Sequence, residues 1–184
     1  MSLDTLPDWL PGVERLPSKW GEQNRTWAPN FTREPDLLVI HSASVANFPA
    51  EYLYNPETVA AAHFAFYEGR VEKLPVGIPH PTPMTFVQMA SLKHSVPHCG
   101  GSVCMGDRRP NMRSIGIELP AAHNSYDLFQ VLLNAILVAL TPLKFWTEHK
   151  MIDVRKRDPV PGTGFSAKWL SESGLICVGM DKIA

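Results

Sequence analysis

The chain has 184 residues, of which 45% are apolar and 19% charged, and its net charge is −1 with a pI near 6.6. This composition predicts one ordinary globular domain with a sizeable core. It argues against proteins that hold nucleic acid or an anionic membrane by bulk charge. The longest apolar run, residues 131–140, is too short to cross a bilayer, which takes about 20 residues.

Two features bear on where the protein is made. The N-terminus lacks a basic start followed by an apolar run, so no secretory signal is expected. The cysteines Cys99, Cys104 and Cys177 have no C-x-x-C spacing and are expected to be reduced thiols. We therefore expect synthesis in the cytoplasm. A target outside the cytoplasm would require another factor to release the protein.

Residues 1–36 are rich in Pro, Trp and charge, which predicts an irregular N-terminal arm over a domain formed by residues 37–184. Two interpretations of the arm stay open. It is either a plain extended cover or a segment that contacts the substrate.

The next segments predict a series of strands. The apolar run at 37–40 is typical of a buried strand, and residues 58–74 indicate the end of a helix, a strand, a turn at Glu68-Gly69 and a second strand. Residues 75–84 form a Pro-rich loop. Further strands are expected at 85–92 and 113–120, with a Gly-rich polar loop at 98–112 between them.

Residues 125–140 form the clearest helix candidate, apolar on almost every side and therefore expected to be well buried; Pro142 ends it. A short C-terminal helix is expected at 165–172. This order of elements predicts a mixed α/β domain with a single central β-sheet flanked by helices.

A hydrolytic zinc site needs three protein ligands and one open position for water. His149 and Asp158 stand nine residues apart, and a turn at Asp158-Pro159 would bring both side chains to one point. His41, at the end of a buried strand, is the natural third ligand. Each residue also has an ordinary interpretation, as a partly buried histidine or a turn-forming aspartate.

Two further residues suit catalysis beside such a metal. Glu118, near the end of the strand at 113–120, can serve as a general base. Lys156, two residues before Asp158, can stabilise a developing oxyanion. The ordinary alternatives are an edge glutamate and an exposed lysine.

Five sequence blocks resemble, in the same order, the zinc-dependent N-acetylmuramoyl-L-alanine amidases. That family shares its fold with peptidoglycan recognition proteins, phage amidase lysins and cytoplasmic anhydro-muropeptide amidases. The match runs from about residue 37 to residue 170. The blocks are "LLVIHSAS", "AAHFAFYEGRV", "HCGGS", "NMRSIGIELP" and "EHKMIDVRKRDPVPGTGFSAKWL".

The resemblance implies roles for individual residues. His41, His149 and Asp158 match the zinc ligands, and some family members have Cys at the third position. Glu118 matches the catalytic carboxylate, and Lys156 matches the lysine that supports the transition state.

Three other positions also match the family. His98 corresponds to a histidine near the substrate cleft and Asn111 to a loop asparagine, so both are expected to bind substrate. His63 corresponds to a His or Asn whose role is packing. The segment 72–86 is longer than the usual hairpin and is expected to reshape one wall of the cleft.

The resemblance implies zinc-dependent hydrolysis of the amide bond between N-acetylmuramic acid and L-alanine. We expect a monomeric, cell-wall-lysing amidase such as a phage endolysin, acting after release from the cytoplasm. One alternative is a cytoplasmic recycling amidase that takes anhydro-muropeptides. Another, of a different class, is a peptidoglycan-binding module without catalysis.

Overall fold

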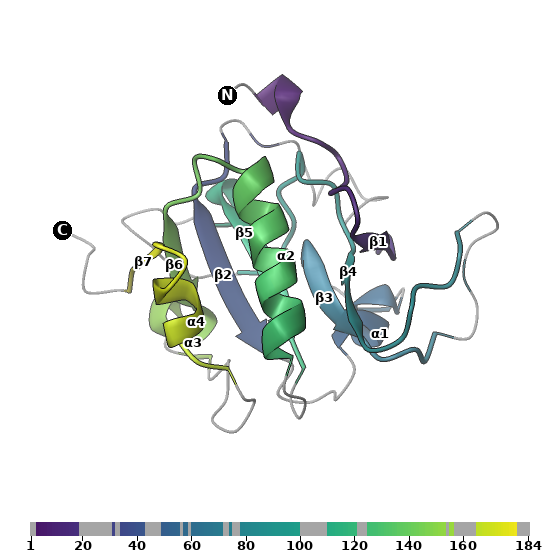
Figure 1. The fold of residues 1–184 in the computed structure, drawn as a ribbon. Helices are drawn as coiled ribbons and strands as arrows, with labels where there is room; N and C mark the ends of the chain where they lie inside the picture. Colours follow the sequence, from purple (N-terminus) through teal and green to yellow (C-terminus); the bar gives the residue numbers. More distant parts are fainter. Residues whose placement is uncertain are drawn as a thin grey trace.

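The computed structural model describes residues 3–18, 31, 34–42, 49–55, 57–58, 60–71, 74, 78–99, 110–120, 125–153, 155–156 and 165–179. A seven-stranded sheet runs through these residues in the order β1-β4-β3-β5-β2-β6-β7 (Figure 1). Its strands are β1 (Glu14–Arg15), β2 (Leu37–Ser42), β3 (Phe64–Tyr67), β4 (Thr85–Gln88), β5 (Ser114–Leu119), β6 (Phe145–Glu148) and β7 (Ile176–Cys177). The helices are α1 (Pro49–Tyr54), α2 (Tyr126–Ala139), α3 (His149–Ile152) and α4 (Lys168–Ser171).

The sheet is mixed, which confirms the predicted fold class. The five strands β3, β5, β2, β6 and β7 run parallel to one another, whereas β4 is antiparallel to β3. The predicted strands at 37–40, 85–92 and 113–120 correspond to β2, β4 and β5. Parallel strands bring their carboxyl ends to one edge of the sheet, where side chains from distant parts of the chain can meet.

The strand predicted directly after the turn at Glu68-Gly69 is wrong. Residues 70, 71 and 74 are not in a strand, and β3 pairs instead with β4. Gly69 has φ +98°, and a Cβ atom there would lie 2.8 Å from Pro83. The chain therefore leaves β3 in a conformation that suits glycine and returns to the same point fourteen residues later. The described residues 78–82 of the segment between them lie beside β1, at the edge of the sheet.

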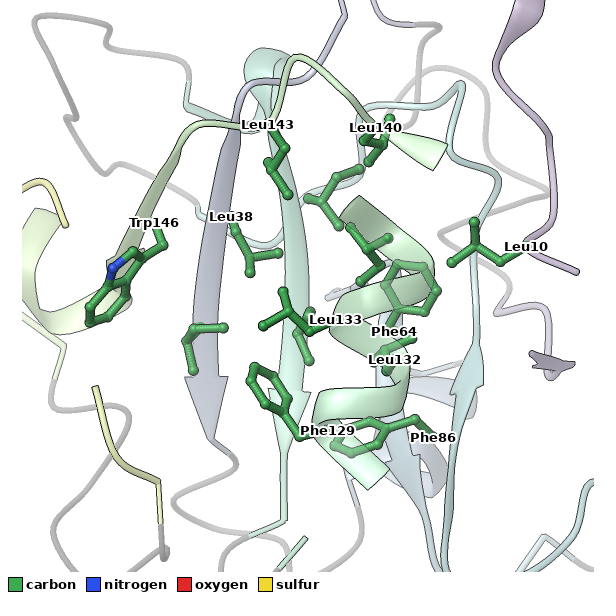
Figure 2. Close-up of a cluster of buried hydrophobic side chains, with 14 of the residues drawn as sticks. Leu10, Leu38, Phe64, Phe86, Phe129, Leu132, Leu133, Leu140, Leu143 and Trp146 are labelled. Carbon is green, nitrogen blue, oxygen red and sulfur yellow. The ribbon is translucent and has the colours of Figure 1, made fainter. Parts of the chain in front are cut away.

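Helix α2 covers one face of the sheet, and Figure 2 shows its side chains packed on the strands. The expectation that this apolar helix is well buried is wrong for part of its surface, because the side that faces the sheet is buried and another side is exposed. Val131 is 69% exposed and Val138 80%. The buried positions are Phe129, Leu132, Leu133 and Ile136.

The described part of the predicted arm contributes to the sheet and to the core. Strand β1 pairs in parallel with β4 at the sheet edge. Leu6 and Leu10 belong to the core beneath α2, and Leu16 to a second cluster on the other face. The boundary at residue 36 between arm and catalytic domain stays a prediction.

Alternation along β2 decides which face of the sheet carries the polar residues. Leu38 and Ile40 face α2, whereas Leu37 and Val39 pack into a separate cluster with Ile152. His41 continues the second set, since successive strand residues point to opposite faces. The candidate site therefore lies at the carboxyl end of β2, on the face opposite α2. None of the described helices is long and apolar enough to cross a membrane.

Candidate metal centre and active site

Strand register brings three of the predicted site residues together. In the parallel ladder, His41 of β2 pairs with Glu118 of β5. On the other side of β2, Ile40 pairs with Glu148, the last residue of β6. His149 follows directly as the first residue of α3, and so it lies beside the end of β2.

The side chains of these residues converge. His41 Nδ1 lies 3.0 Å from His149 Nδ1 and 4.0 Å from Glu118 Oε1. Both histidines are buried, and the Glu118 side chain is 18% exposed. Two nitrogen ligands of a tetrahedral zinc ion lie about 3.3 Å apart, given Zn–N bonds of about 2.0–2.1 Å. The spacing of the two Nδ1 atoms therefore suits shared metal coordination.

The other half of the predicted site is only partly described. Asp158 lies outside the described residues, so its place beside the two histidines stays a prediction. Lys156 is exposed; its backbone N–H donates to Asp153 O over 2.9 Å, and no hydrogen bond or ion pair joins its ammonium group to another described residue.

Asp153 anchors the turn that leads toward Lys156. Its buried carboxylate accepts hydrogen bonds from the backbone N–H and the guanidinium of Arg155, over 2.7–3.0 Å. These bonds lower the pKa of Asp153 to about 2. The turn after α3 is therefore held by a charge-assisted pair.

Sequence analysis missed the cluster on the other side of His41. His41 Nε2 lies 3.0 Å from His98 Nδ1. Cys99 Sγ lies 2.9 Å from the same His98 atom and 3.9 Å from His41 Nε2. One ligand atom from each of the three buried residues lies within 4.8 Å of the others, so this group could hold a metal ion. The adjacent His-Cys pair in "HCGGS" was the available signal, but a small buried thiol gave no reason to select it.

Loop packing places His98 against β5. The Asn111 side-chain oxygen accepts hydrogen bonds from the backbone N–H groups of His98 (3.2 Å) and Cys99 (2.7 Å). The His98 ring lies over Gly116, where a Cβ atom would come within 2.7 Å of the ring. Asn111 thus shapes the loop that carries His98, and substrate contact by these two residues stays a prediction.

Burial controls the charge of two histidines. Desolvation lowers the pKa of His98 well below its usual value, with His41 as the next cause. Desolvation also lowers the pKa of His63 to about 4. His63 uses both ring nitrogens: Nδ1 accepts from the Gly116 backbone N–H at 3.1 Å, and Nε2 lies 2.8 Å from His94 O. These bonds suit the packing role that the resemblance implies.

A pocket of about 650 Å³ lies between the arm and the segment that connects β3 with β4. Arg15 packs over the Trp9 ring, with the guanidinium carbon 4.9 Å from its centroid. Pro79 and His80 form part of the opposite wall. The expectation that segment 72–86 reshapes a wall of the catalytic cleft stays a prediction.

Comparison with known proteins gives a consistent answer at the level of fold. No protein-family model matches the sequence, and no curated protein is similar to it in sequence. Several solved structures are similar, and three of them are described here. A selenomethionine derivative of AmpD has a TM-score of 0.61 and 21% identity over 90% of this chain and 96% of its own. AmpDh3 from Pseudomonas aeruginosa has a TM-score of 0.58 and 17% identity over 90% of this chain and 65% of its own.

The third structure is the N-acetylmuramyl-L-alanine amidase AmiD from E. coli, in complex with anhydro-N-acetylmuramic acid-L-Ala-D-γ-Glu-L-Lys. Its TM-score is 0.52 and its identity 21%, over 77% of this chain and 58% of its own. The chain has the fold of AmpD and AmiD. It spans nearly the whole of AmpD and little more than half of AmiD.

Proposed function

We propose that the protein is a zinc-dependent N-acetylmuramoyl-L-alanine amidase that lyses cell walls, in the manner of a phage endolysin. The observation that carries the proposal is the convergence of His41, His149 and Glu118 at the carboxyl edge of parallel strands. It occurs within the fold of a protein crystallised with a muropeptide substrate.

The donor set that fits zinc best is His41 and His149 through their Nδ1 atoms, with Asp158 as the third ligand. Support comes from the 3.0 Å separation of the two nitrogens and from the burial of both rings. Neutral imidazoles and a carboxylate are common ligands of catalytic zinc. When bound, zinc would polarise the scissile carbonyl and acidify a water molecule.

The chain's own residues would then carry the proton and the charge. Glu118, 4.0 Å from His41 Nδ1, would take a proton from the attacking water and return it to the amine of L-alanine as the amide bond breaks. Lys156 would stabilise negative charge on the carbonyl oxygen. Glu118 alone can act first as general base and then as general acid, because the carboxyl group that accepts the proton later donates it.

A second role is favoured by a specific observation. AmiD is in complex with an anhydro-muropeptide. This ligand supports the alternative role of a recycling amidase that takes anhydro-muropeptides. The chemistry is the same in both roles, and only the size of the substrate differs.

Mass spectrometry of released products tests the function and separates the two roles. The purified protein would be incubated with intact sacculi and, separately, with soluble anhydro-muropeptides, each with a zinc-stripped control. Free peptide stems that begin with L-alanine, released from sacculi only with zinc, are expected for wall lysis. Release from soluble muropeptides alone would indicate recycling. Binding of both substrates without cleavage would refute the proposed amidase activity and indicate a peptidoglycan-binding module.

Cobalt substitution tests the donor set. A thiolate that ligates Co²⁺ gives a charge-transfer absorption, so the His41–His98–Cys99 set would show one and the set with Asp158 would not. We expect no such band in the wild-type protein. A band that disappears in Cys99→Ser and persists in Cys177→Ser would replace the proposed set with the one containing Cys99. Cys177 is a suitable control because it lies on β7, outside the group formed by His41, His98 and Cys99.

A further inference from the structure

His98 is joined to the backbone on one side and to His41 on the other, and the first of these contacts fixes where its proton lies. His98 Nε2 is 3.0 Å from Ser114 Oγ and 3.4 Å from Ser114 O. The Ser114 hydroxyl donates its hydrogen to Pro110 O over 2.6 Å. Both oxygens of Ser114 can therefore only accept from the ring, so His98 Nε2 must carry the proton.

The opposite nitrogen follows from the charge of the ring. The His98 ring is buried, and a charged imidazole is disfavoured away from water, so the ring is taken as neutral. A neutral imidazole has one N–H, which leaves Nδ1 as an acceptor. His41 Nε2 lies 3.0 Å from this atom and must donate to it.

We infer that His98 is a positioning residue, which fixes His41 in the tautomer that carries its proton on Nε2 and turns the bare Nδ1 toward His149. The inference rests on the proposed function for its consequence, because Nδ1 is the atom offered to zinc. Histidine ligands of metals commonly donate their other N–H to such a partner, which sets the tautomer and the ring orientation.

The side chains on one side of β5 suit the position of the His98 ring. Three alternate residues of β5 face the same side of the sheet. Ser114 accepts a hydrogen bond from His98, Gly116 leaves room for the ring, and Glu118 approaches His41. Any side chain at Gly116 would enter the ring position, because its Cβ would lie 2.7 Å from His98 Cγ and Nδ1. The absence of a side chain there is independent support for a fixed place for His98.

Cys99 competes for the same lone pair, since its Sγ lies 2.9 Å from His98 Nδ1. One lone pair accepts one strong hydrogen bond, and a thiol is a weaker donor than an imidazole N–H. His41 should therefore win this contact. The opposite result would leave the proton of His41 on Nδ1 and its Nε2 free for the group that contains Cys99.

Nitrogen-15 NMR of the imidazole side chains tests the inference directly. The protein would be labelled at histidine and measured free of zinc at pH 8, with His41 and His98 assigned by substitution. We expect both rings to be protonated at Nε2. In His98→Leu we expect the preference of His41 to be lost, while His98→Asn should retain it because the Asn oxygen can occupy the place of Nδ1. A wild-type His41 protonated at Nδ1 would overturn the inference.

Zinc affinity provides the second readout, measured by competition with a chromophoric chelator. His98→Leu and Gly116→Ala should weaken zinc binding about 10–100-fold, and His98→Asn should restore most of it. His80→Leu, which makes the same replacement at an exposed histidine, should leave affinity unchanged. Thermal unfolding would confirm that each variant folds. Equal affinity in folded His98→Leu and wild type would also overturn the inference.

The two readouts separate this inference from the proposed function. The tautomer is measured without zinc and does not depend on enzyme activity. A wild type that binds no zinc but shows His41 protonated at Nε2 would refute the proposed metal centre and leave the tautomer assignment intact. Zinc binding together with a His41 proton on Nδ1 would refute the tautomer assignment and leave the proposed metal centre intact.

Discussion

Glu118 is the residue whose chemical role can be separated most cleanly from the metal. Its Oε1 lies 4.0 Å from His41 Nδ1, and its side chain keeps 18% exposure, which allows contact with water. Glu118→Gln preserves the shape and removes the basic group. We expect zinc affinity to stay within a few-fold of wild type and amide hydrolysis to fall about 10²–10⁴-fold, measured as release of peptide stems. Full activity in the zinc-loaded variant would assign the base to another group.

The buried His63 leads to a separate prediction, which concerns how the free energy of unfolding depends on pH. Its pKa of about 4 lies below the ordinary 6.5, so the unfolded state binds a proton more readily than the folded state. The stabilisation is complete above pH 6.5 and is lost as the pH falls toward 4. The difference is worth about 3 kcal/mol at most.

Denaturant unfolding at pH 7.5 and pH 4.5 measures this effect. Wild type should lose about 2–3 kcal/mol more than His63→Asn between the two conditions. Each protein is compared with itself at the two pH values, which cancels the cost of the substitution, and Asn carries no group that titrates in this range. Equal losses in the two proteins would show that His63 titrates normally in the folded state.

Individual residues also show what could be learned from the sequence. The resemblance indicated His41, His149 and Glu118, and the structure brings these three together. The contacts of His98 could not be predicted, because they depend on a loop that folds over Gly116, eighteen residues further along. Hydrogen-bond partners are set by the tertiary structure, whereas strand patterns are local.

Among the elements, α2 carries apolar residues both on its buried side and on its exposed side. Its apolar residues continue almost around the helix, and this is why the sequence predicted a well-buried helix. In the structure Leu133 is fully buried and points toward the sheet (Figure 2). Val138 on the same helix is 80% exposed. Apolar periodicity identified the helix but could not reveal that only one of its sides is covered.

A matched pair of substitutions checks this asymmetry. Leu133→Ala should lower the free energy of unfolding by about 2–5 kcal/mol, because it leaves a cavity between α2 and the sheet. Val138→Ala removes methyl groups that are already in water and should change stability by no more than about 0.5 kcal/mol. Chemical denaturation of both variants gives the comparison. A large loss from Val138→Ala would mean that another surface covers this side of α2 in solution.

In the molecule as a whole, the candidate metal centre connects segments that are far apart in the sequence. His41 is the next-to-last residue of β2, and His149 lies 108 residues later, after α2 and β6. A single mixed sheet flanked by helices could be predicted from the order of elements. The pairing of β3 with β4, the edge position of β1 and the core positions of Leu6 and Leu10 could not, because the loop and arm sequences carry no strand periodicity.

Because the ligands come from separate elements, zinc should bind the folded chain far better than the unfolded one and so stabilise it. At a free zinc concentration 100 times the dissociation constant, the gain is about 2.7 kcal/mol. Thermal unfolding with zinc and with excess chelator should therefore show a higher Tm for the zinc form. His149→Ala provides the control, since losing one of the two Nδ1 ligands should abolish the zinc-dependent shift while the variant stays folded. A shift that persists in His149→Ala would place the bound zinc elsewhere, and the group formed by His41, His98 and Cys99 is the site to examine next.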